Sequence, residues 1–127
     1  MLQEQTILHV VDNSGAKTVQ CIKLLGGSKQ KYAKLNHSII VSVKQLWNKT
    51  KSVTKVSKKQ VHKALVIKTV FRYYNQIGLK KNFNQNCCVL IDKLGNPVGT
   101  RVLGFVPKTL VNKKQFQKFI SLSKGFV

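Results

Sequence analysis

The stretch from Thr6 to Leu24, TILHVVDNSGAKTVQCIKL, decides the fold class. Two apolar segments, 6–11 and 17–24, flank the sequence Asp12-Asn13-Ser14-Gly15, whose residue types favour turns because they accept positive φ or bond their own backbone. The second segment alternates between apolar and polar residues over much of its length, which is the pattern of a half-buried strand. The stretch therefore predicts a β-hairpin.

Later apolar runs predict three more strands, at 38–43, 64–71 and 87–91, and a short extended piece at 101–105 follows the turn Gly95-Asn96-Pro97. Five strands with turn residues between them, in a chain of 127 residues, favour a small closed barrel over a sandwich. We therefore expect a mainly β protein, with a small closed five-stranded β-barrel that carries basic loops or a hairpin.

The tail is the part of the chain with helical spacing. Phe116, Phe119 and Ile120 recur at i, i+3 and i+4, and Gly125 lies where a helix would stop. The sequence thus predicts short C-terminal α-helices over about 106–127, after a barrel over about 1–105, within a single domain that spans 1–127.

The formal net charge is +20, from 23 basic residues against three acids, Glu4, Asp12 and Asp92. A charge of this size repels itself in a free monomer, and a polyanionic partner offsets the repulsion. A nucleic acid is the favoured partner, and an anionic membrane or another acidic partner is the alternative. Only Arg72 and Arg101 are arginines. Lysine suits phosphate neutralisation without base reading, so the balance favours binding of RNA shape and backbone, although an AT-rich genome also raises lysine content.

Lysines gather in three predicted loops, 28–34, 48–59 and 80–81, and we expect these loops to form one rim that faces phosphates. Four aromatic residues flank the loops and either stack on unpaired bases or pack as ordinary core: Tyr32, Trp47, Tyr73 and Tyr74. The candidate RNA-binding residues are Lys17, Lys23, Lys29, Lys31, Tyr32, Lys34, Lys49, Lys51, Lys55, Lys58, Lys59, Lys80, Lys81 and Arg101.

Other kinds of site are not indicated. Three carboxylates are too few for paired acid–base catalysis, and the three histidines, His9, His37 and His62, fall in different predicted elements. The three cysteines form no CxxC pair, and adjacent Cys87 and Cys88 would point to opposite faces of a strand as small hydrophobes. We therefore expect no enzyme, no metal, no cofactor and no small-molecule substrate. The apolar runs are too short for a membrane span, and we expect RNA, not a membrane, as the partner.

Several of these segments, in order along the chain, resemble the large-subunit ribosomal protein L-fourteen family. The matching segments are Gln3-Glu4-Gln5-Thr6, Val11-Asp12-Asn13-Ser14-Gly15-Ala16, Cys21-Ile22-Lys23, Gly26-Gly27-Ser28, Lys31-Tyr32-Ala33, Ala64-Leu65-Val66-Ile67, Gly78, Phe83, Asn86, Val89-Leu90, Pro97-Val98-Gly99-Thr100-Arg101, Gly104 and the tail 116–122. The chain departs from the family pattern at Ile77, Asn36-His37, Gln60 and Ser123-Lys124-Gly125, and most of these departures remove acid or add base.

The resemblance implies a closed barrel that binds large-subunit rRNA at the subunit interface and helps to form bridges to small-subunit rRNA. It also implies a neighbouring large-subunit protein, protein nineteen in bacterial-type ribosomes, and a docking face for a ribosome-silencing factor. By alignment that face falls on Thr100, Arg101, Lys118 and Ser121. The alternative function is that of an extraribosomal single-strand RNA- or DNA-binding barrel module, which needs exposed aromatic residues on one barrel face.

The compartment is inferred from composition. Residues 1–10 lack the basic start of a signal peptide and the arginine-rich character of a transit peptide. A short chain that is rich in lysine and poor in acids is typical of a ribosomal protein encoded in a mitochondrion, and a plastid or the cytoplasm of an AT-rich bacterium is the alternative.

Overall fold

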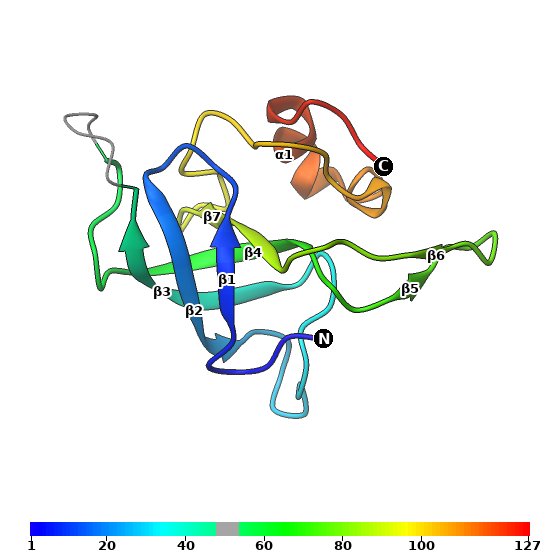
Figure 1. Ribbon diagram of the computed structural model, residues 1–127, viewed down its shortest axis with the longest axis horizontal. Helices are drawn as coiled ribbons and strands as arrows, with labels where there is room; N and C mark the ends of the chain where they lie inside the picture. Colours follow the sequence, from blue (N-terminus) through cyan, green and yellow to red (C-terminus); the bar gives the residue numbers. More distant parts are fainter. Residues whose placement is uncertain (48–53) are drawn as a thin grey trace.

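The computed structural model describes residues 1–47 and 54–127, and its centre is a closed five-stranded barrel (Figure 1). The barrel strands are β1 (Ile7–Val10), β2 (Ala16–Leu24), β3 (Ser38–Leu46), β4 (Val61–Lys68) and β7 (Cys87–Ile91). A two-stranded hairpin, β5 (Tyr73–Tyr74) and β6 (Lys80–Lys81), leaves the barrel after β4. The tail forms two 3₁₀ turns, η1 (Lys108–Leu110) and η2 (Lys114–Phe116), and the helix α1 (Gln117–Leu122).

The barrel closes in the order β1-β2-β3-β4-β7. Each neighbouring pair is antiparallel except β1 and β7, which are parallel. In the first hairpin Leu8 lies opposite Val19, as the alternation of the opening stretch requires. The expected mainly β fold, with a closed five-stranded barrel and a short C-terminal helix, is confirmed.

Two apolar cores lie on opposite faces of the barrel wall. The interior core includes Val19, Val41 and Cys88, all almost fully buried, and the outer core packs Leu65 against Phe119 beneath the tail. Because β4 and β7 are covered on both faces, their residues form continuous apolar runs instead of alternating. The expectation that the adjacent cysteines point to opposite faces is confirmed, since Cys87 belongs to the outer core and Cys88 to the interior.

Burial also keeps the cysteines unreactive. It raises the pKa of the Cys88 thiol well above its ordinary value, and it raises the pKa values of Cys21 and Cys87 as well. The three thiols are free and buried. They therefore behave as small apolar side chains, as we expected.

Some element boundaries differ from the sequence-based expectation. The strand expected at 64–71 instead covers Val61–Lys68, because the chain turns away toward the hairpin at Thr69 and the Val70 N–H donates to Asn86 Oδ1 at 2.9 Å. The extended piece expected at 101–105 is reduced to an isolated bridge between Val102 and Asp12. The helical tail is mostly 3₁₀ turns and coil, with one α-helix of six residues.

Candidate nucleic-acid interface

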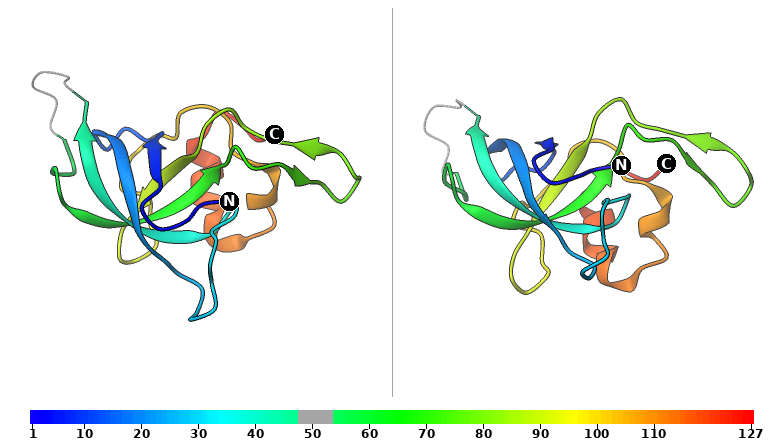
Figure 2. Two further views of the ribbon diagram at one scale, coloured as in Figure 1. Left: turned by 60° about the horizontal axis from the view of Figure 1, so that its bottom comes forward. Right: turned by 90° about the horizontal axis from the view of Figure 1, so that it is seen from below.

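The basic segments leave the barrel at two opposite ends, so the expectation of a single phosphate-facing rim is wrong. Segment 25–37 precedes β3, whereas residues 54–60 follow it, and a nine-residue strand separates them. The hairpin follows β4, which is antiparallel to β3, and this places its root beside segment 25–37. Figures 1 and 2 show the hairpin and segment 25–37 projecting in different directions from this region.

We call these regions the hairpin end and the turn end. The hairpin end consists of segment 25–37, the adjoining end of β2 and the β5–β6 hairpin. The turn end consists of the β1–β2 turn (11–15), the adjoining start of β2 and residues 54–60 and 96–101. At the hairpin end lie Lys23, Lys29, Lys31, Tyr32, Lys34, Lys80 and Lys81. At the turn end lie Lys17, Lys55, Lys58, Lys59 and Arg101. The other two candidates, Lys49 and Lys51, lie outside the described residues.

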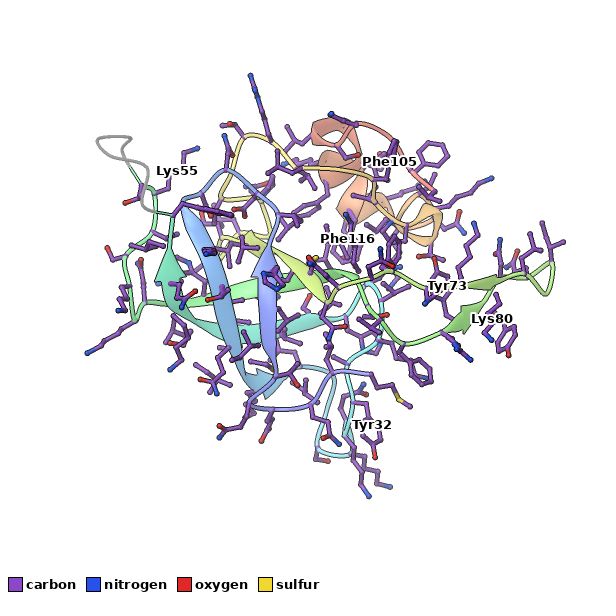
Figure 3. The ribbon with its side chains drawn as sticks, viewed as in Figure 1. Tyr32, Lys55, Tyr73, Lys80, Phe105 and Phe116 are labelled. Carbon is purple, nitrogen blue, oxygen red and sulfur yellow. The ribbon has the colours of Figure 1, made fainter. Side chains whose placement is uncertain are left out.

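Segment 25–37 is fixed to the body of the protein near its middle. Leu2 and Ala33 are buried and exchange two backbone hydrogen bonds, of 2.9 and 2.8 Å. The neighbouring side chains of Lys31 and Lys34 are exposed, and Tyr32 is 41% exposed and points away from the barrel (Figure 3). A short buried anchor therefore presents cations and one aromatic ring to solvent.

His37 adds no charge to this segment near neutral pH. Its pKa is lowered, first by burial and then by the nearby cations Lys113 and Lys34. The imidazole is consequently neutral above its lowered pKa, and its Nδ1 lies 3.3 Å from the side-chain nitrogen of Gln30. The positive charge of the segment comes from lysines alone.

Lys80 and Lys81 lie on a strand, which corrects the expectation that they occupy a loop. Tyr73 pairs with Lys81 and Tyr74 with Lys80, and the turn closes with a 2.8 Å bond from the Asn75 N–H to the Leu79 carbonyl. Side chains alternate across a strand, so each face of the β5–β6 hairpin carries one tyrosine and one lysine. Tyr74 is 71% exposed, which makes its ring accessible to a partner.

At the turn end, Lys17 and Trp47 lie close to each other. The Lys17 ammonium is 5.2 Å from the centroid of the Trp47 ring, a cation–π distance, and the ring is 48% exposed. Tyr32 precedes β3 and Trp47 follows it, so the two residues lie at opposite ends of the barrel. These two exposed aromatic residues therefore do not share one barrel face, which an isolated single-strand-binding module would need.

The four residues of the expected silencing-factor face lie on neighbouring segments. Thr100, Arg101, Lys118 and Ser121 are all exposed. The Val102 N–H donates to the Leu122 carbonyl at 3.1 Å and so joins the segment of Thr100 and Arg101 to the end of α1. Lys118 Nζ donates to Asn96 Oδ1 at 2.6 Å, which joins the same helix to the preceding turn.

Asn13 fixes the backbone of this face, a role that its place in a turn sequence did not reveal. Its Oδ1 accepts from the backbone N–H groups of Thr100 at 2.7 Å and Arg101 at 3.1 Å, and its Nδ2 donates to Thr100 Oγ1 at 2.6 Å. Gly99 lies so close that an added Cβ would be 2.7 Å from Asn13 Oδ1. The side chain thus holds segment 99–101 in one geometry.

Replacing Asn13 with Ala is expected to make segment 99–101 more mobile. Three hydrogen bonds at an exposed position are lost, so we expect a decrease of about 1–2 kcal/mol in the free energy of unfolding. The backbone amides of Thr100 and Arg101 should also exchange with solvent faster than in wild type, which hydrogen exchange measures. Asn84→Ala, a change at an exposed asparagine near the hairpin, is the control. Unchanged exchange at Thr100 and Arg101 would contradict this role for Asn13.

The described residues contain neither a metal-ligand cluster nor a membrane-spanning helix. Within 1–47 and 54–127 no group of three or more His, Cys, Asp or Glu side chains is arranged to hold a metal ion. Across the same residues no helix is long and apolar enough to cross a membrane. The carboxyl group of Asp12, one of the few acids, is buried and bonded to backbone amides and a serine hydroxyl.

A protein-family model described as "Ribosomal protein L14p/L23e" matches residues 1–127. The chain therefore belongs to this family, as its motifs indicated, and is a ribosomal protein of the large subunit.

Proposed function

We propose that this large-subunit ribosomal protein binds large-subunit rRNA at the subunit interface and contributes to intersubunit bridges during translation. The family match over residues 1–127 carries the proposal. The net charge of +20 and the exposed lysines at both ends of the barrel support it, because rRNA is the polyanion that a ribosomal protein meets.

The proposed mechanism is electrostatic and architectural. Lysines on short anchored segments neutralise phosphates, and the closed barrel holds the two ends at a constant separation. Arg101 differs from the lysines because a guanidinium can donate two parallel hydrogen bonds to one phosphate. A domain that spans 1–127, with the tail packed on the outer face of the barrel, suits this role as a rigid spacer.

The two-ended charge distribution supports a bridging role. One end can lie on large-subunit rRNA while the other is free to contact small-subunit rRNA. Neighbouring large-subunit proteins are further proposed partners, with a protein of the nineteen type among them. The exposed face of Thr100, Arg101, Lys118 and Ser121 is the proposed docking site for a ribosome-silencing factor.

The proposed location is the mitochondrial ribosome, and a plastid or bacterial ribosome is the alternative. The excess of lysine over arginine and the scarcity of acids support an AT-rich genome of the kind that organelles carry.

The assignment is tested by gradient sedimentation. A tagged copy of the chain is expressed in the organism that the chain comes from, and the ribosomal particles are washed at high salt before they are loaded. We expect the tagged chain to migrate with the large subunit and to retain organellar large-subunit rRNA, which sequencing of the bound RNA identifies. The isolated tag is the control. Protein at the top of the gradient, with mixed RNA or none, would overturn the ribosomal role and favour the free RNA-binding module.

A further inference from the structure

A cavity of about 320 Å³ lies at the hairpin end, between segment 25–37 and the root of the β5–β6 hairpin. The residues that line it are Met1, Lys34, Leu35, Asn36, Thr69, Phe71, Arg72, Tyr73 and Thr109. Ligand pockets in proteins span about 300–1,000 Å³, so this cavity has room for one ring system of the size of a nucleobase. Figure 3 shows Tyr73 at the root of the hairpin, where this cavity lies.

Asn36 contributes an acceptor that has no donor. The residue is 8% exposed, its backbone N–H donates to the Val66 carbonyl, and its Nδ2 donates to Thr109 Oγ1 at 2.8 Å. Its Oδ1 is buried and accepts no hydrogen bond from any of the described residues. Buried polar atoms are normally paired, because an unpaired one loses its bonds to water without a replacement. Asn36 is among the residues that line the cavity, so a rotation of its side chain would turn this oxygen toward a ligand that donates an N–H.

The remaining lining residues define the rest of the ligand. Phe71 is 49% exposed and Tyr73 is half-buried, so both rings offer surface to a planar group. The exposed cations Lys34 and Arg72 also border the cavity, and no carboxylate is among its lining residues. The ligand should therefore combine a flat ring, an N–H donor and a negative charge.

We infer that this cavity binds one unpaired nucleotide of RNA. The base packs against Phe71 and Tyr73, an N–H group of the base donates to Asn36 Oδ1, and the phosphate lies near Lys34 and Arg72. An apolar peptide side chain would fill the same walls but would leave the two cations without an anion. This inference rests on the proposed RNA-binding function and adds to it a direct contact with a base, which phosphate neutralisation by lysines does not provide.

Titration of the ¹⁵N-labelled full chain with adenosine 5′-monophosphate, followed by NMR, tests the inference. We expect saturable shifts of the Asn36 side-chain amide and of the backbone amides of 71–73. Ribose 5-phosphate has the same charge but no base, and it should bind at least about ten-fold more weakly because stacking on the aromatic rings is lost. Equal binding of the two compounds would overturn the inference.

Two variants test separately the hydrogen bond to Asn36 and the stacking on Phe71. Asn36 has a φ of 65°, which glycine adopts without strain, so Asn36→Gly removes the amide and keeps the backbone. We expect it to weaken adenosine monophosphate binding about three- to ten-fold, as loss of one hydrogen bond would. Phe71→Ala should weaken binding about ten-fold. Phe126→Ala, a change at a similarly exposed ring that does not line the cavity, should leave the affinity unchanged. Wild-type affinity in both cavity variants would contradict the inference.

Two further comparisons identify the source of the nucleotide and separate this inference from general RNA binding. Hexa-adenylate should bind more tightly than adenosine monophosphate, and the advantage should shrink as salt rises. If the mononucleotide binds as tightly, an RNA ligand is excluded. If Asn36→Gly and Phe71→Ala bind hexa-adenylate like wild type, with steep salt dependence intact, the cavity inference fails and the proposed RNA binding stands. If wild type binds no RNA at any salt concentration, the proposed function itself fails.

Discussion

Replacing Asp12 with Ala is expected to lower the free energy of unfolding by about 2–4 kcal/mol. The Asp12 side chain is 3% exposed. Its Oδ1 accepts from the Ser14 N–H at 3.0 Å and from the Ser14 hydroxyl, and its Oδ2 accepts from the Leu90 N–H at 3.1 Å. Alanine would leave two backbone donors in a buried region without acceptors, each at a cost of about 1–3 kcal/mol.

The position of Asp12 explains why the effect should be global. The carboxylate lies at the end of β1 and bonds to β7, the strand that closes the barrel against β1. Next to it, the Leu103 N–H donates to the Val11 carbonyl at 2.7 Å, and Val102 forms a bridge with Asp12. The side chain thus connects the β1–β2 turn to the closing strand, and the backbone of residues 11 and 12 pairs with the segment that leads to the tail.

Urea unfolding followed by circular dichroism measures this effect, and Asp92→Ala is the matched control. Both changes remove one negative charge, but Asp92 is exposed, and among the described residues its Oδ1 accepts only from the adjacent Lys93 N–H at 2.7 Å. We expect the control to change stability by no more than about 0.5 kcal/mol. Asp12→Asn keeps one side-chain oxygen as an acceptor and should fall between wild type and Asp12→Ala. Equal losses in Asp12→Ala and Asp92→Ala would show that charge, not the buried hydrogen bonds, is responsible.

The sequence predicts the barrel well where local pattern and tertiary packing agree. The β1–β2 hairpin follows from two apolar segments around a turn sequence, and β7 was expected at the residues that it occupies, 87–91. The end of β4 was misplaced because Val70 and Phe71 read as a continuation of an apolar run. In the structure both are about half exposed, since they belong to the root of the hairpin.

The hairpin and the candidate site were less predictable, for a physical reason. Strands of two residues, such as β5 and β6, have too few side chains to show a period, and they depend on the turn at Gly78 and on their partner strand. The directions in which basic loops project depend on strand order, which the sequence does not state. Asn36 offered one signal that was available, because it is a departure from the family pattern, and its positive φ of 65° is one that asparagine adopts more readily than most residues.

The affinity of the isolated chain for large-subunit rRNA is expected to fall by about 10³–10⁵ between 50 and 200 mM salt, as a protein with roughly 6–10 phosphate contacts does. Each neutralised phosphate releases condensed counterions, so the slope of log affinity against log salt concentration counts the contacts. Filter binding at a series of salt concentrations measures it.

Single substitutions test how much an individual lysine contributes to the slope. Lys80→Ala should reduce the magnitude of the slope by about one contact, whereas Gln76→Ala, on the same exposed hairpin, should leave it unchanged. Lowering the pH from 8 to 7 should add no contact from His37, because the pKa of His37 is lowered and its ring is still neutral at pH 7. A slope near zero would mean that the net charge of +20 is not used to bind phosphates. Because the two ends of the barrel carry separate groups of lysines, we expect substitutions at one end to reduce the slope independently of substitutions at the other.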